Sequence, residues 1–153
     1  MSKVKNSTQT SYVNWLNSFQ FTHFVTLTTR YELTLKSSRR LIERFHNKLK
    51  KHDFEPLIFW VAEKYELKDG YHIHALMRLN RKIDKHEFRF ITELYQIVAG
   101  TSKCAGDNGK LKFENWSRID LQKYDPKRKA GAYVSKYVLK ENNSINAEYD
   151  ILF

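Results

Sequence analysis

The chain has 153 residues, and its 27 Lys and Arg against 17 Asp and Glu give a formal net charge of +10 at pH 7. Hydrophobic residues make up 41% and charged residues 29%, with only 5 Gly and 2 Pro, which excludes collagen-like, low-complexity and disordered chains. We expect one domain over residues 1–153, with its core at about residues 21–140.

Cysteine content and hydropathy restrict the compartment. The single cysteine, Cys104, cannot form an internal disulfide and gives neither a cysteine zinc site nor a redox pair. No run approaches the roughly 20 apolar residues of a membrane span, and residues 1–10 lack the apolar stretch of a signal peptide. These features predict a cytoplasmic protein with no membrane partner.

The first predicted elements are a strand and a basic helix. Phe21–Thr29 is rich in β-branched and aromatic residues that alternate along the run, which is typical of a strand. Ser37 or Ser38 can cap a helix that continues to about Lys51, with apolar residues at every fourth position. The rest of this helix is largely basic.

A hairpin is predicted next. The apolar run Leu57–Glu63 and the extended run Tyr71–Leu79 are separated by a segment containing Asp69-Gly70. Asp-Gly is among the strongest short hairpin signals, so we expect these two runs to pair antiparallel around a two-residue turn.

The second half of the chain repeats the helix and strand pattern. Asp84 and Glu87 resemble a capping box for a helix to about Val98, whose inner face would include Phe88. A loop at residues 101–109 and a strand at 116–122 follow. Asp125-Pro126 then opens a helix to about residue 140. The order predicts an α+β, ferredoxin-like (βαββαβ) antiparallel sheet with helices on one side and an additional C-terminal helix.

The positive charge is clustered. Residues 36–51 hold seven basic residues against Glu43 alone, and residues 117–140 hold seven against Asp120 and Asp125. Clustered charge beside abundant aromatic residues indicates a nucleic-acid partner, and a solvated basic surface is the alternative.

His72 and His74 are the first candidate ligands. Residues two apart on a strand point to the same face, so the two imidazoles form half of a metal site, although such pairs also occur as packing or surface histidines. A two-residue turn would put the odd-numbered residues of the preceding strand on the same face, and so Glu63 with them. A longer loop or a bulge would instead favour Glu66. One oxygen and two imidazoles suit Mn²⁺ or Mg²⁺ better than a closed structural zinc.

The predicted C-terminal helix carries two tyrosines. Tyr133 and Tyr137 are four residues apart and share a helix face, and Lys136 borders that face. A phenol becomes a nucleophile at neutral pH when a nearby cation favours the phenolate. A basic amphipathic helix with two core tyrosines is the alternative interpretation.

Three motifs follow one another on successive predicted elements: Val25-Thr26-Leu27-Thr28, His72-Ile73-His74 and Tyr133-Val134-Ser135-Lys136-Tyr137. In this order the sequence resembles the HUH endonucleases, in particular the rolling-circle replication initiators, or Rep proteins, of phages, small viruses and plasmids. The resemblance runs from about Phe21 to Lys140 and thus covers most of the chain.

The resemblance implies a metal-dependent nickase and strand transferase that acts on single-stranded DNA, at an origin or hairpin, through a 5′-phosphotyrosine intermediate. It implies His72, His74 and Glu63 as metal ligands for Mn²⁺ or Mg²⁺, and Tyr133 with Lys136 as catalytic residues. Tyr137 would be a second catalytic tyrosine, since some phage initiators use two, whereas many plasmid and viral relatives need one. Because no helicase domain follows, a host helicase and polymerase are expected partners.

Three other classes compete with this interpretation. Single-strand transposases share the histidine pair, but their tyrosine helix typically carries a glutamine ligand where Tyr137 stands, which favours replication. A non-catalytic nucleic-acid-binding module would use Trp60, Tyr71 and Trp116 as stacking platforms. A hydrolytic metallonuclease would use a metal-activated water in place of tyrosine.

Overall fold

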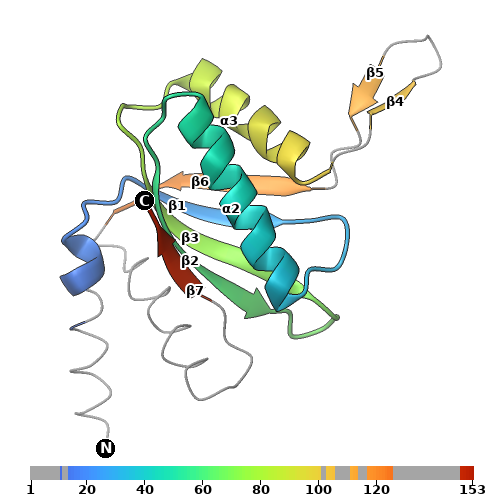
Figure 1. The fold of residues 1–153 in the computed structure, drawn as a ribbon, viewed down its shortest axis with the longest axis horizontal. Helices are drawn as coiled ribbons and strands as arrows, with labels where there is room; N and C mark the ends of the chain where they lie inside the picture. The colour runs from blue at the N-terminus through green and yellow to red at the C-terminus, as the bar shows by residue number, and fades with distance from the viewer. Residues whose placement is uncertain (1–10, 12–13, 101–102, 106–110, 114–116, 126–148) are drawn as a thin grey trace, which may run out of the picture.

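The fold is built on one antiparallel sheet with two helices on one of its faces (Figure 1). The computed structural model describes residues 11, 14–100, 103–105, 111–113, 117–125 and 149–153. The predicted helix at 126–140, and with it Tyr133, Lys136 and Tyr137, lies outside these residues.

The sheet has five strands in the order β6-β1-β3-β2-β7, and every neighbouring pair is antiparallel. The strands are β1 (His23–Thr28), β2 (Leu57–Lys64), β3 (Tyr71–Arg78), β6 (Arg118–Lys123) and β7 (Tyr149–Leu152). With α2 (Leu35–Lys51) between β1 and β2 and α3 (Lys85–Val98) after β3, the order along the chain is that of a ferredoxin-like α+β fold. The predicted fold class is therefore confirmed, with β7 as an additional edge strand.

The first helix begins earlier than the sequence predicts. Thr34 is the N-cap residue: its hydroxyl accepts from the Ser37 backbone N–H, and the Ser37 hydroxyl in turn accepts from the Thr34 backbone N–H. The prediction of Ser37 or Ser38 as the cap is wrong, because Ser37 is the third helical residue and forms the other half of this capping box. Lys48, Lys50 and Lys51 occupy the last turn, where the helix dipole favours positive charge.

The β2–β3 connection also differs from the prediction. β2 ends at Lys64, which pairs with Tyr71, so residues 65–70 form the loop in place of a two-residue Asp69-Gly70 turn. Gly70 has φ +98°, and a Cβ atom there would lie 2.8 Å from the Glu32 Cγ atom. The loop is thus closed at Gly70 by positive φ and by close contact with the segment before α2.

The second helix begins as predicted but orients one residue differently. The Asp84 carboxylate caps α3 by accepting from the Glu87 backbone N–H, as the sequence indicates. Phe88, predicted on the inner face, is 41% exposed, and Leu94 is buried. Residues 103–105 and 111–113 form the short strands β4 (Lys103–Ala105) and β5 (Leu111–Phe113), so the prediction of a plain loop at 101–109 is wrong.

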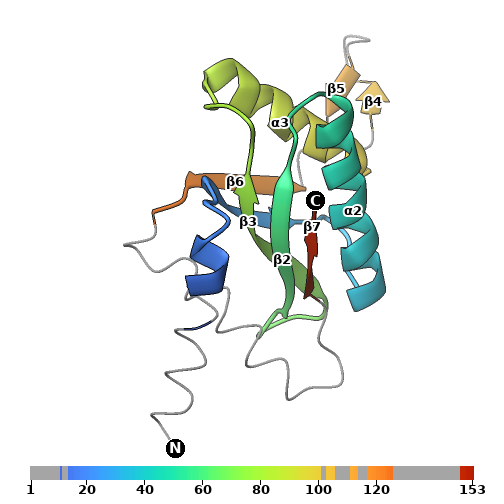
Figure 2. The ribbon, with the colours of Figure 1, turned by 60° about the vertical axis from the view of Figure 1, so that its left-hand side comes forward.

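Apolar side chains are buried on both faces of the sheet. The larger cluster lies under α2 and α3, and the smaller one lies on the opposite face, where it includes Leu16 and Phe21 from the segment before β1. Figure 2 shows the helices on one side and this N-terminal segment on the other. Within the described residues, no helix has the length and apolar character needed to cross a bilayer.

Candidate metal centre

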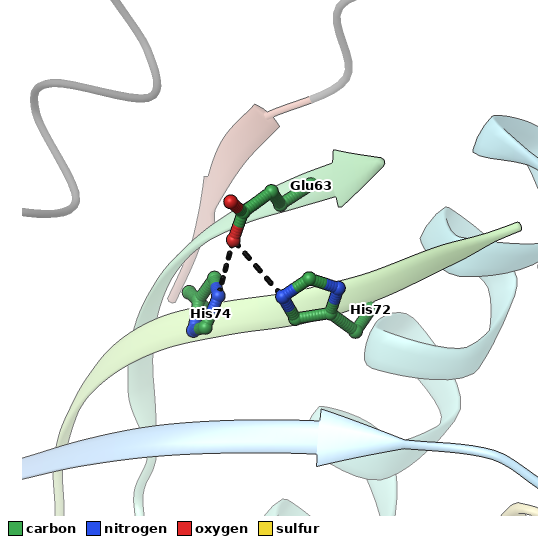
Figure 3. A group of neighbouring side chains, drawn as sticks. All are labelled: Glu63, His72 and His74. Carbon is green, nitrogen blue, oxygen red and sulfur yellow. Dashed lines mark hydrogen bonds and ion pairs between the residues drawn. The ribbon is translucent and has the colours of Figure 1, made fainter. Parts of the chain in front are cut away.

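Strand pairing brings three potential ligands together on the face opposite the helices. Glu63 lies near the end of β2 and is paired with His72 near the start of β3. Since side chains alternate along β3, Ile73 points into the core under the helices while His72 and His74 share the other face. Figure 3 shows the Glu63 carboxylate reaching both imidazoles.

The ligand atoms converge on one point. The Nε2 atom of His72 lies 2.9 Å from Glu63 Oε2, and the Nε2 atom of His74 lies 2.5 Å from the same oxygen. One nitrogen or oxygen atom from each residue lies within 4.8 Å of the others. Two imidazole nitrogens and one carboxylate oxygen in this arrangement could hold a divalent metal ion.

Burial keeps the imidazoles neutral. The side chains of His72 and Glu63 are each 15% exposed and that of His74 is 8% exposed. Burial lowers the pKa of His72, and burial together with the neighbouring His72 lowers the pKa of His74, against the opposing effect of Glu63. At pH 7 both side chains therefore present a lone pair, which is the form that binds metal.

The outer nitrogens of the two imidazoles have different surroundings. His74 Nδ1 lies 3.3 Å from the Thr26 hydroxyl on β1, and the Phe24 ring stacks on His74 with ring centroids 5.9 Å apart. The Tyr65 ring stacks on His72 at 4.5 Å, but His72 Nδ1 is buried without a hydrogen-bond partner among the described residues. The two rings are thus held by packing, and one of them by a hydroxyl as well.

Thr26 is the residue whose position beside the site the sequence analysis missed. The alternation of Thr26 and Thr28 with Val25 and Leu27 placed the threonines on the polar face but did not show which strand lies beside them. In the structure Thr26 is paired with His74 on one side and with Asp120 of β6 on the other. The pairing of β1 with β3 was the signal needed.

The remaining predicted site residues divide into two groups. Glu66 lies exposed in the 65–70 loop, outside the cluster, whereas Glu63 lies within it. Tyr133, Lys136 and Tyr137 lie outside the described residues, between β6 and β7, which are the two edge strands of the sheet.

The fold and the cluster define a class: a ferredoxin-like α+β protein with a candidate two-histidine, one-carboxylate metal centre on its sheet. The family model of the replication-associated protein ORF2 matches residues 22–142. The chain therefore belongs to this family of replication-associated proteins.

Two relatives come from Sulfolobus islandicus rod-shaped virus 1. The crystal structure of the hypothetical protein ORF119 superimposes with a TM-score of 0.52 and 20% identity, covering 89% of this chain and 95% of that one, and so shares the fold. Uncharacterized protein 117 is 28% identical over 72 residues, which is 47% of this chain and 60% of that relative. The matched region thus spans less than two thirds of the second relative.

Proposed function

We propose that this protein is a metal-dependent, tyrosine-using single-stranded DNA nickase and strand transferase of the HUH type that initiates rolling-circle replication. The observation that carries the proposal is the convergence of His72, His74 and Glu63 within 4.8 Å in a chain of the replication-associated family. Neutral imidazoles and a carboxylate are a donor set suited to Mn²⁺ or Mg²⁺ bound with open coordination positions.

Each residue has a defined role in the proposed reaction. His72, His74 and Glu63 would hold the divalent ion, which when bound supplies Lewis-acid polarisation of the scissile phosphate. The hydroxyl oxygen of Tyr133 or Tyr137 forms a bond to phosphorus as the bond from phosphorus to the 3′ oxygen breaks. The tyrosine loses its proton to solvent and the departing 3′ oxygen gains one. Lys136 balances the negative charge of the phenolate.

The products explain the link to replication. The 5′-phosphotyrosine ester conserves the energy of the broken bond, so the strand can be rejoined without a nucleotide cofactor. The free 3′-OH is a primer for a host polymerase, and a host helicase would supply the unwinding. The clustered basic residues of α2 supply positive charge for the DNA backbone.

Covalent capture tests the proposal directly. Labelled single-stranded oligonucleotides incubated with the protein and Mn²⁺ should yield a protein–DNA adduct that survives a denaturing gel. Tyr133→Phe or Tyr137→Phe should lose most of the adduct, Tyr133→Phe the more, and the double variant should lose all of it. Adduct formation by the double variant would overturn the mechanism.

The same gel separates the competing classes. A hydrolytic metallonuclease would cut without leaving an adduct, and a non-catalytic binding module would do neither. The binding-module interpretation also loses one of its stacking platforms, because Trp60 is fully buried under the helices. Replacing His72 and His74 together by alanine should abolish cutting while most DNA affinity remains, since the phosphate-binding lysines and arginines are unchanged.

A further inference from the structure

A second cavity lies away from the metal centre. It has a volume of about 640 Å³ and is formed by the start of β1, the β3–α3 connection, the first turn of α3 and the end of β6. His23 and Lys123 are paired across β1 and β6 and lie on the helix-bearing face, opposite His74. Its volume is within the range of small-molecule sites, about 300–1,000 Å³.

The described lining of this cavity contains basic residues and no acidic ones. Arg81 is already engaged, because its Nε atom lies 3.0 Å from Glu87 and its guanidinium lies over the Phe54 ring. Lys82 and Lys123 are exposed and make no ion pair with any described residue. These two ammonium groups are available for an anion.

One wall of the cavity is apolar. Phe88, near the start of α3, is 41% exposed although it lies in an amphipathic helix, and it borders the cavity beside Leu121 and Ile83. Burial and the neighbouring Lys123 lower the pKa of His23, so this residue adds no charge at pH 7. An exposed aromatic ring beside two lysines is the combination that binds a base and its phosphate.

We propose that this cavity binds a nucleotide of single-stranded DNA outside the scissile step, with the phosphate between Lys82 and Lys123 and the base against Phe88. The proposal rests on the proposed function, which supplies the DNA strand. Leu79, at the cavity, is five residues beyond His74 along β3, a rise of about 17 Å, and lies on the opposite face. The cavity therefore holds flanking sequence, and its occupation lengthens the footprint of the protein on DNA.

Fluorescence anisotropy with a labelled oligodeoxythymidine tests the aromatic wall. Phe88→Ala should weaken binding about tenfold or more, as expected for loss of one stacked base. Phe90→Ala is the matched control, because Phe90 is 37% exposed on the same helix but packs towards His52 and Phe54. Equal effects of the two substitutions, or none from Phe88→Ala, would overturn the proposal.

The salt dependence of binding tests the lysines. Lys82→Ala and Lys123→Ala should each reduce the slope of log affinity against log salt by about 0.7, and the double variant by about 1.4. An unchanged slope in the double variant would overturn the assignment of the phosphate.

Two further measurements separate this proposal from its neighbours. Free thymidine monophosphate should compete only weakly, and competition stronger than that of the oligonucleotide would show a free-nucleotide site instead. If wild type neither binds nor cuts single strands, the proposed function fails. If it binds and cuts while the Phe88 and lysine variants bind like wild type, only the cavity proposal fails.

Discussion

Thr26 places a hydroxyl group 3.3 Å from the Nδ1 atom of His74. If Nε2 serves as the metal ligand, Nδ1 carries the proton and donates it to this hydroxyl, which orients the ring. We predict that Thr26→Val lowers Mn²⁺ affinity about 10–100-fold, as loss of such outer partners typically does. Calorimetric titration of the metal-free protein measures this without reference to DNA cleavage.

The matched control is Thr26→Ser, which keeps the hydroxyl and should retain most of the affinity. Wild-type Mn²⁺ affinity in Thr26→Val would show that Phe24 stacking alone orients His74.

Glu63 and Glu66 provide a second comparison at the residue scale. Glu63→Gln should lower Mn²⁺ affinity by at least about 100-fold, more than loss of an outer partner, because it removes the only negative charge of the cluster. Glu66→Gln should change the affinity less than about twofold, since Glu66 is exposed in the loop. The same titration measures both, and a larger effect at Glu66 would contradict the ligand set.

At the scale of elements, His46 connects α2 to the start of β2. The residue is 5% exposed, and its Nε2 atom lies 3.0 Å from the Pro56 carbonyl oxygen, to which the neutral ring donates. Burial lowers the pKa of His46 below its ordinary value of 6.5, outweighing the hydrogen bond to Pro56. The contribution of His46 to stability is therefore present above pH 6.5 and is lost as the pH falls through the lower, folded-state pKa.

Urea unfolding of wild type and His46→Gln tests this linkage. We expect the variant to be less stable by about 1 kcal/mol at pH 7.5, since it loses a buried hydrogen bond and packing. The difference should shrink at pH 5.5. The other histidines are common to both proteins and cancel in the difference, so a gap that grows on acidification would contradict the sign of the pKa shift.

The β2–β3 hairpin shows how far sequence reasoning extends to the site. The two-residue turn predicted Leu67 opposite His72, whereas the structure pairs Glu63 with His72, a displacement of four residues. An even displacement preserves which face each side chain occupies, and so Glu63 still shares the histidine face. The pattern of alternation was sufficient for the face, but the Asp-Gly signal did not reveal the contact of Gly70 with Glu32 that closes the longer loop.

At the scale of the whole molecule, metal binding should couple to folding. Ligands from β2 and β3 must come together in the native state to bind the ion, so Mn²⁺ binds the folded chain in preference to the unfolded one. At 100 times its dissociation constant, an ion adds about 2.7 kcal/mol, which corresponds to a rise in Tm of about 5–10 °C.

Thermal melts in Mn²⁺ and in EDTA measure this rise. The double variant His72→Ala with His74→Ala should melt at the same temperature in both solutions. An equal rise in the double variant would place the stabilising ion elsewhere in the molecule.

The global topology was predictable only where it follows from local patterns. The helices and the strands β1, β2, β3 and β6 have clear periodicity, which yields the ferredoxin-like order. β7 has only four residues, and its pairing with β2 joins segments about 90 residues apart, for which no local signal exists. The same non-local pairing determines that Thr26 meets His74.

The pairing of β7 with β2 also affects solubility. β2 begins with six consecutive buried residues, Leu57–Ala62, whereas the opposite edge strand, β6, is mostly exposed and carries Arg118, Asp120 and Lys123. Without β7, which Arg39 also binds through Asp150, the unpaired backbone of a hydrophobic strand would face solvent and could recruit the same strand of another molecule. The last strand therefore acts as a guard against edge-to-edge aggregation, a role independent of any chemistry on the sheet.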